Sequence, residues 1–237
     1  MSPSKPLYHR RRFPAEIISH CVWLYFRFSL SYRDVEEIMA ERGIVVTYES
    51  IRAWSQHFGG ICAKRLRCRT SRPGDRWHLD EVFLSINGQR QCLWRAVDQQ
   101  GQVLDILVQS RRNKEAAKKF FRKLLRGLRY FPRAIITDKL AGYGAAEAEV
   151  LPNVEHIQAK RSNNRAENSH QPTRKRKRRM RRLKSFGRAQ RFLATFGVIG
   201  SHFRPGRHLM GARSYREIMH RRFTEWREVT KPDFAIL

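Results

Sequence analysis

Residues 76–108 read RWHLDEVFLSINGQRQCLWRAVDQQGQVLDILV, and this stretch decides the fold. A strand-like apolar run ends at Ile86 and is followed by Asn87-Gly88, a dipeptide that favours a two-residue hairpin turn. Two further apolar runs follow, over 91–97 and 103–108. The pattern therefore predicts three antiparallel strands in succession.

Helix and strand patterns alternate in the chain that follows. Periodicity and length predict a helix after Asn113, a strand over 134–137, a helical patch over 145–150, a fifth strand over 154–157, and helices from about Asn164 and over 186–203. The resulting order, β-β-β-α-β-α-β-α, is that of an RNase H-like fold. We therefore predict a mixed α/β (α+β) domain in which helices flank a five-stranded mixed sheet.

Three short helices are predicted before the sheet, because apolar residues recur at helical spacing over 15–28, over 31–43 and after Thr47. A Gly-containing turn between the last two is typical of a helix-turn-helix unit, whose final helix enters the major groove of DNA. The base-side candidates are Tyr48, Glu49, Ser50 and Arg52, and Arg33 is the candidate phosphate contact. The same pattern also fits an ordinary three-helix packing module.

These patterns divide the chain into five parts. We expect a basic arm over 1–13, the helix-turn-helix domain over 14–58, an Arg-rich linker over 59–74, the RNase H-like domain over 75–205 and a C-terminal tail over 206–237.

The chain is strongly basic, since its 237 residues include 49 Lys and Arg against 21 Asp and Glu and the formal net charge is +28. An excess of this size points to phosphate backbones or an anionic membrane as the partner. The most apolar early run, residues 21–26, is too short for a membrane span or a secretory signal. We therefore expect a nucleic-acid partner, no membrane and a cytoplasmic location. The spacing of the four cysteines indicates neither a zinc site nor a disulfide framework.

Three carboxylates stand out against this charge. They are Asp80 in WHLDE (77–81), Asp138 in IITDK (135–139) and Glu167 in NNRAEN (163–168). Phosphoryl transfer with two divalent ions needs carboxylates that hold the ions about 3.5–4 Å apart, and Mg²⁺ prefers oxygen ligands. Asp80 falls within a predicted strand, where an unpaired carboxylate would be costly and a metal ion is a natural partner. Glu81 is its rival, and each acid taken alone also fits a surface carboxylate or an Arg partner.

Glu167 is the last acidic residue before a long basic segment. No Asp or Glu occurs over 168–216, whereas eight of the nine residues over 174–182 are basic. A carboxylate placed there can hold a metal ion while the following turns bind backbone phosphates. Arg174, seven residues after Glu167, falls on the same helix face. The further DNA-contact candidates in this run are Lys175, Arg176, Lys177 and Arg178.

The strings WHLDE, IITDKLAGY and RSNNRAEN, with a basic residue seven positions after the Glu, resemble motifs of the DDE transposases of bacterial insertion sequences. The resemblance is strongest to the insertion sequence six family and runs from about Pro14 to Phe203. It implies a core similar to retroviral integrases, with Asp80, Asp138 and Glu167 as catalytic triad and metal ligands and with Arg174 assisting.

The same resemblance implies cofactors and partners. Mg²⁺ is the expected metal, with Mn²⁺ as a substitute, and the expected partner is double-stranded DNA, both the element ends and the target. The N-terminal module would read terminal inverted repeats in a bacterial, nucleoid-associated protein. Because two DNA ends must be held together, we expect at least a homodimer on DNA.

One departure from the family pattern keeps other functions open. The spacer between Asp138 and Glu167 has 28 residues, several fewer than is usual in the family, and the shortening falls around 148–153. One alternative is a catalytically inactive DNA-binding relic or regulator of the element. Another is an RNA-binding protein whose basic run contacts RNA.

Overall fold

A computed structural model describes residues 7–69, 74–128, 130–137, 141–158, 164–180, 183–206 and 210–232, without the side chains of 141–143 and 164–167. Eight helices and five strands lie in this part of the chain. The chain forms two compact units, Ser71–Gly197 and a second made of Met1–Thr70 with Val198–Leu237. Each unit is described by itself below.

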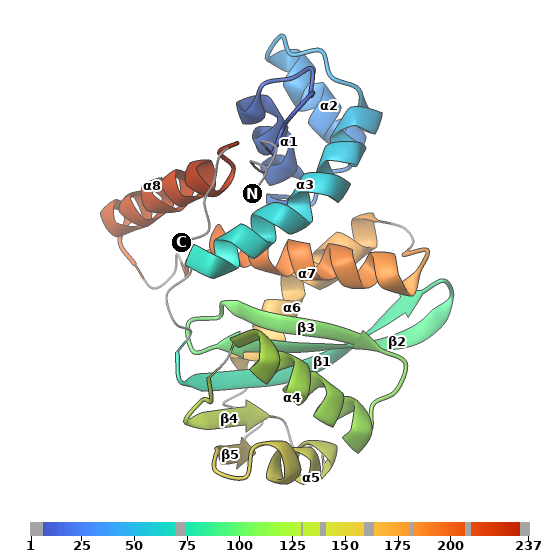
Figure 1. Ribbon diagram of the computed structural model, residues 1–237, viewed down its shortest axis with the longest axis vertical. Helices are drawn as coiled ribbons and strands as arrows, with labels where there is room; N and C mark the ends of the chain where they lie inside the picture. Colours follow the sequence, from blue (N-terminus) through green and yellow to red (C-terminus); the bar gives the residue numbers. More distant parts are fainter. Residues whose placement is uncertain are drawn as a thin grey trace, which may run out of the picture. The chain divides into compact units, whose positions relative to one another are not determined.

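The unit Ser71–Gly197 is built on one mixed sheet (Figure 1). Its strands are β1 (Arg76–Ile86), β2 (Gln89–Asp98), β3 (Val103–Gln109), β4 (Ala134–Thr137) and β5 (Glu155–Gln158). Their order across the sheet is β3-β2-β1-β4-β5, with the first three strands antiparallel and β4 and β5 parallel to β1. This is the RNase H-like arrangement, and the predicted fold class is confirmed.

The turn between β1 and β2 is fixed by two residues with positive φ. Asn87 has φ 50° and Gly88 has φ 78°, the left-handed geometry that a two-residue hairpin turn requires. The turn sets the register, so that Asp80 lies opposite Arg95 and Glu81 lies opposite Trp94. Because successive strand residues point to opposite faces, the register also decides which acid faces which layer of helices.

Helices cover both faces of this sheet. On one face, α4 (Lys114–Leu128) packs Phe120, Phe121 and Leu124 against Trp77 and Trp94, with α5 (Ala141–Val150) alongside α4 (Figure 1). On the other face, α7 (Phe186–His202) contributes Ala189 and Leu193 to a second apolar core, while α6 (Asn164–Arg179) contacts β1 and β2. Asp80 shares the second face, because it alternates with Leu79 along β1.

The second unit contains the three predicted N-terminal helices, α1 (Ala15–Arg27), α2 (Tyr32–Glu41) and α3 (Tyr48–Arg69). A capping box starts α2, since the Ser31 hydroxyl accepts from the Asp34 amide and the Asp34 carboxylate accepts from the Ser31 amide. Gly43, with φ 72°, allows the turn that leads to α3. The three helices pack through buried apolar residues that include Ile18, Val35, Ile51, Trp54 and Phe58.

Residues of the expected linker and of the expected arm take part in the packing of this unit. Residues 59–69 continue α3 without a break, because Cys62, Ala63 and Leu66 carry its apolar stripe onward and are buried. In the expected arm, Tyr8 is buried and its ring centroid lies 4.8 Å from that of Phe58.

Residues of the expected C-terminal tail belong to this second unit. The helix α8 (Ala212–Val229) packs on α3, and Arg65 Nη1 donates to the Val229 carbonyl at 2.9 Å. Trp226 is buried, with its ring centroid 5.8 Å from that of Phe203. The buried residues of α8 therefore pack within this unit.

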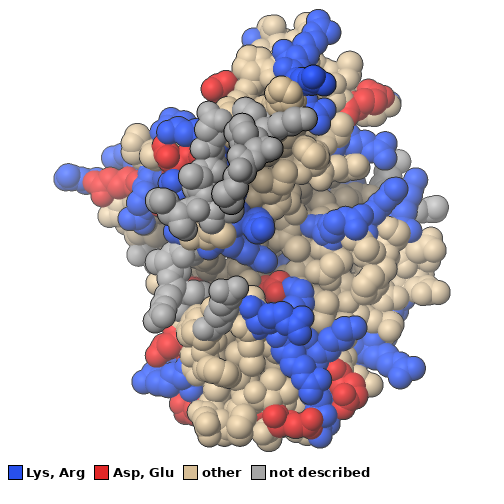
Figure 2. Space-filling model, viewed as in Figure 1, with Lys and Arg blue, Asp and Glu red and all other residues tan. Residues whose placement is uncertain are grey.

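Basic side chains cover more of the face shown in Figure 2 than acidic side chains, which occur in smaller groups. This surface matches the net charge of +28 and favours a polyanionic partner. Among the described residues, we find no helix that combines the length and the apolar character needed to cross a bilayer.

Candidate active site

Asp80 lies in the middle of β1, on the sheet face that α6 covers. Its side chain is 16% exposed, and its Oδ2 lies 3.4 Å from Nε2 of His170, a residue of α6 with a side chain that is 0% exposed. Arg95 is its cross-strand neighbour on β2. The carboxylate is therefore enclosed by the sheet and α6 but keeps an opening to solvent.

Glu81, the rival of Asp80, points to the opposite face. Its side chain is 2% exposed and is held by the guanidinium of Arg112, which approaches from the start of α4. A carboxylate held in a charge pair on the α4 face has little capacity left for a metal ion. This arrangement favours Asp80 as the strand ligand.

Buried polar contacts hold α6 on the sheet. Two groups on α6 accept from the Arg95 guanidinium, the Ser169 carbonyl and the Thr173 hydroxyl. His170, Thr173 and Arg176 are buried at intervals of three residues, so they form one stripe along the helix. Glu167 lies one further interval towards the start of α6, where only the backbone is described.

The environment of His170 keeps its ring neutral. Burial, together with the nearby cations Arg95 and Arg174, lowers the pKa of His170 well below its ordinary value. A neutral imidazole carries one N–H donor, so the ring can face a carboxylate as a hydrogen-bond donor but not as a counter-charge.

A second polar chain lies behind the end of β4. Thr137, the last residue of β4, is buried, and its Oγ1 lies 2.8 Å from Nε2 of His156 on β5. Nδ1 of His156 lies 3.8 Å from a carboxylate oxygen of Glu147 on α5. Burial lowers the pKa of His156 and raises the pKa of Glu147. These contacts hold Thr137, the residue directly before Asp138, in place. Asp138 itself lies outside the described residues.

The described donors suit a hard divalent cation. Asp80 offers a partly open carboxylate, and oxygen is the ligand atom that Mg²⁺ prefers. No group of three His, Cys, Asp or Glu side chains converges among the described residues, a set that includes neither Asp138 nor the Glu167 side chain. The structure thus places one of the three predicted ligands and the helix that carries another.

The shortened spacer still contains α5 and β5. Between them lie four residues, 151–154, in a turn where the Leu151 amide donates to the Glu147 carbonyl at 2.7 Å and the Val154 amide donates to the Leu151 carbonyl at 3.1 Å. Leu151 is buried in the α4-side core. A compact turn therefore joins the two elements at the point where we expect the shortening.

The basic part of α6 has an exposed side and a buried side. Arg174, Lys175 and Arg178 are exposed, and Lys177 is half-buried. Arg176, by contrast, is 2% exposed, and its guanidinium lies over the Phe192 ring at 5.6 Å from the centroid. Arg176 therefore packs between helices, which makes it a weaker candidate for DNA contact than its neighbours.

The start of α3 is held by polar contacts from two sides. Thr47 Oγ1 accepts from the Ser50 amide at 3.3 Å, and a Glu36 carboxylate oxygen from α2 accepts from the Tyr48 amide at 3.0 Å. The Arg33 guanidinium lies over the Tyr48 ring at 5.0 Å from its centroid. Arg52 is exposed one turn along α3, so Arg33, Tyr48, Ser50 and Arg52 gather around one helix start.

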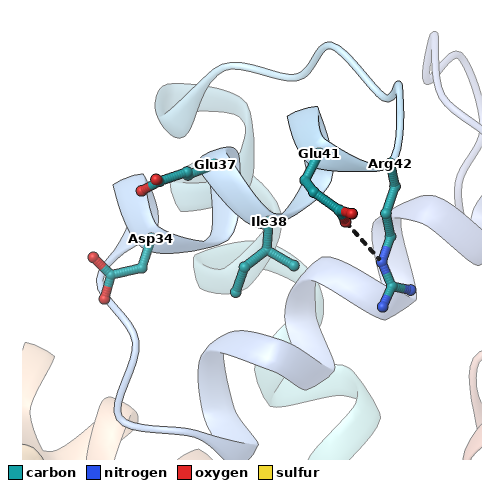
Figure 3. A pocket seen from close by; sticks show the side chains of 5 residues that line it. All are labelled: Asp34, Glu37, Ile38, Glu41 and Arg42. Carbon is teal, nitrogen blue, oxygen red and sulfur yellow. Dashed lines mark ion pairs between the residues drawn. The ribbon is translucent and has the colours of Figure 1, made fainter.

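The neighbouring surface of α2 is acidic. Asp34, Glu37, Ile38 and Glu41 fall at helical spacing and line a pocket together with Arg42 (Figure 3). Arg42 forms an ion pair with Glu41 at 3.9 Å. Phosphates are disfavoured beside these carboxylates, so the pocket is not a candidate phosphate site.

Sequence reasoning missed four residues that shape this site: Arg95, His156, His170 and Thr173. A signal existed for two of them. The two-residue turn at Asn87-Gly88 places position 95 opposite position 80, and His170 follows Glu167 by three residues, the spacing of neighbours on a helix face.

Comparison with known proteins bears on the family. The family model of a DDE domain, that of IS240-type transposases, matches residues 74–205. The chain is 30% identical over 172 residues to the transposase for insertion sequence-like element IS431mec of Staphylococcus aureus, covering 70% of this chain and 76% of that protein. It is 29% identical over 172 residues to the transposase for insertion sequence element IS257 in transposon Tn4003 of Staphylococcus aureus, with the same coverage.

Two solved structures of viral proteins resemble part of this chain. The simian T-cell lymphotropic virus intasome in complex with PP2A regulatory subunit B56 gamma matches 43% of this chain and 39% of its own, at 16% identity and TM-score 0.36. The HTLV-2 integrase catalytic core domain in complex with magnesium matches 42% of this chain and 71% of its own, at 17% identity and TM-score 0.32. The assignment of the fold rests on the strand order. With its DDE-domain match and its transposase relatives, this chain belongs to the DDE transposases of the insertion sequence six family.

Proposed function

We propose that this protein binds the terminal inverted repeats of its insertion sequence and catalyses metal-dependent DNA cleavage and strand transfer. The observation that carries the proposal is the position of Asp80, partly open on β1 and in contact with α6 three residues after Glu167. Membership of the transposase family supports the same function. Asp138, which follows β4 directly, is proposed as the third acid.

The proposed ligands of two Mg²⁺ ions, or of Mn²⁺ in their place, are Asp80, Asp138 and Glu167. Such ions, when bound, activate the attacking oxygen at a phosphodiester and stabilise the charge on the leaving oxygen. The protein holds these groups in place: the bonds from Arg95 on β2 hold the helix that carries Glu167 on the sheet, beside the strand that carries Asp80. In-line attack depends on such fixed geometry.

The exposed cations of α6 would hold the DNA backbone beside these acids. Arg174 follows Glu167 by seven residues, about 10 Å along the helix axis, and Lys175 and Arg178 extend the basic side. At the other unit, the start of α3 is the proposed reader of the element ends. We propose that at least two copies act together, because transposition joins two DNA ends.

Nicking of labelled duplexes tests the function. The duplexes should carry the DNA at the two ends of the element that encodes this chain, and each is incubated with the full chain plus Mg²⁺ or plus EDTA. We expect nicking at the element end only with Mg²⁺. Salt-sensitive binding without nicking in Mg²⁺ or in Mn²⁺ would contradict the enzymatic proposal and support the alternative, a DNA-binding relic or regulator.

The basic side of α6 should determine much of the salt dependence of DNA binding. Replacing Arg174, Lys175 and Arg178 together by Gln is expected to lower the slope of log K against log [salt] by about 3, because each lost phosphate contact removes about 0.9. The measurement is fluorescence anisotropy of a labelled duplex from low to high salt.

A matched triple variant provides the control. Lys119, Arg122 and Arg126 are exposed on α4, on the opposite face of the sheet from α6, and their replacement by Gln removes the same charge. We expect that variant to keep the wild-type slope. Equal losses in the two triple variants would mean that overall charge, and not the α6 surface, governs binding.

A further inference from the structure

We propose that His170 is a positioning residue for Asp80: its Nε2–H donates to one carboxylate oxygen and thereby orients the carboxylate towards a metal ion. The inference rests on the proposed function and extends it, because His170 is not one of the three predicted metal ligands. It assigns His170 a role in metal affinity, separate from any contact with DNA.

The first observation is a buried imidazole that faces the carboxylate. His170 is 0% exposed, and within the described part of the chain its ring nitrogens make no hydrogen bond of regular geometry, although the ring also contacts the Asp80 backbone. Nε2 lies 3.4 Å from Asp80 Oδ2, a few tenths of an ångström beyond an ordinary N–H···O hydrogen bond. A buried polar group without a hydrogen bond costs free energy, so a hydrogen bond between the His170 ring and the Asp80 carboxylate would be stabilising.

The second observation is that the helix on either side of His170 is held in place. The residues that flank it along α6, Ser169 and Thr173, both accept from the Arg95 guanidinium. Arg95 is itself opposite Asp80 in the β1–β2 register and is buried. The cation holds the helix at a fixed height above the strand, and that height sets the separation between His170 and Asp80.

The chemistry of such a pair is well defined. A hydrogen bond to one oxygen of a metal-binding carboxylate fixes the orientation of the group, and losing a partner of this kind costs about 10-fold to 100-fold in metal affinity. A role limited to filling space predicts something different: an apolar ring of similar volume would then be equivalent to His170. The two roles can therefore be separated by substitution.

The experiment measures Mn²⁺ binding to the full chain without DNA, by the electron paramagnetic resonance signal of free Mn²⁺. His170→Phe keeps the ring volume and removes the donor, whereas His170→Gln keeps an amide donor close to the position of Nε2. We expect affinity to fall about 10-fold to 100-fold in His170→Phe and to recover most of that loss in His170→Gln. Thermal unfolding of each variant accompanies the titrations.

Further variants make each outcome decisive. If His170→Phe does not fold, His170→Asn replaces it, because its shorter amide does not reach the carboxylate and the same loss is expected. Wild-type affinity in the donor-free variant, or equal losses in the Phe and Gln variants, would overturn the positioning role. A Mn²⁺ loss in His170→Phe that greatly exceeds the corresponding Mg²⁺ loss, measured by calorimetry, would make His170 a direct ligand and also overturn it.

Asp80→Asn separates this inference from the proposed function. If the wild type binds Mn²⁺ and Asp80→Asn does not, the metal site stands and only the His170 variants decide the inference. If the wild type and Asp80→Asn bind Mn²⁺ equally, Asp80 is not a ligand, and the proposed function and the inference fall together.

Discussion

Asp80→Asn is expected to lower metal-dependent nicking of an element end by about 1000-fold, whereas Glu81→Gln keeps nicking by the folded protein. The two acids are adjacent in sequence but face opposite layers of helices. Asn keeps the shape of Asp80 and removes the charge that a divalent cation needs. The lost electrostatic stabilisation corresponds to about 4 kcal/mol in the transition state.

The control variant should have a different effect. Glu81→Gln leaves Arg112 without its carboxylate, so we expect a loss of about 1–3 kcal/mol in the free energy of unfolding. Nicking rates are measured per folded molecule at saturating Mg²⁺, with unfolding followed by urea titration. The opposite result, with nicking lost in Glu81→Gln and kept in Asp80→Asn, would exchange the roles of the two acids.

Arg95→Leu is expected to destabilise the unit Ser71–Gly197 by about 2–4 kcal/mol, because Arg95 lies buried between the sheet and α6. We also expect it to reduce nicking, although Arg95 is not a proposed metal ligand. The substitution leaves the Ser169 carbonyl and the Thr173 hydroxyl without this buried donor. Because these bonds hold α6 on the sheet, the amides of α6 should exchange faster with deuterium, and the helix that carries Glu167 should lose its fixed position.

Two variants complete this test. Arg95→Lys offers one nitrogen in place of a planar fork, so it should recover only part of the stability. Arg188→Leu removes an exposed cation from α7 and should change neither stability nor exchange in α6. Unchanged α6 exchange in Arg95→Leu would show that the helix is held by other contacts.

The sequence predicted the sheet well because its signals are local. Asn87-Gly88 determines the hairpin, and the apolar runs on either side determine the strands. The structure of 59–69 and of 212–229 depends on long-range packing, which composition alone does not reveal. Arg-rich composition indicates a linker at the end of α3, but burial of Cys62 and Leu66 outweighs that signal and keeps the segment helical.

The candidate site was only partly predictable from the sequence. The three acids are predicted from their place in the expected strands and helix and from the family motifs, and the partner of each side chain adds a reason to prefer Asp80 to Glu81. His170 was not predicted, because a lone His on a helix does not reveal which strand the helix will cover. Its proximity to Asp80 depends on the height at which Arg95 holds α6.

The hairpin turn also constrains how this chain can change in length. Asn87 lies seven residues from Asp80, about 23 Å along an extended strand, yet it sets the pairing of Asp80 with Arg95. Inserting one residue into the turn would shift that pairing, and the guanidinium would then no longer lie beneath Ser169 and Thr173. The turn from α5 to β5 lies outside this pairing, so deletions there leave it unchanged. Insertions and deletions should therefore accumulate between α5 and β5. They should be absent from the turn at Asn87-Gly88, although this turn lies far from Asp80.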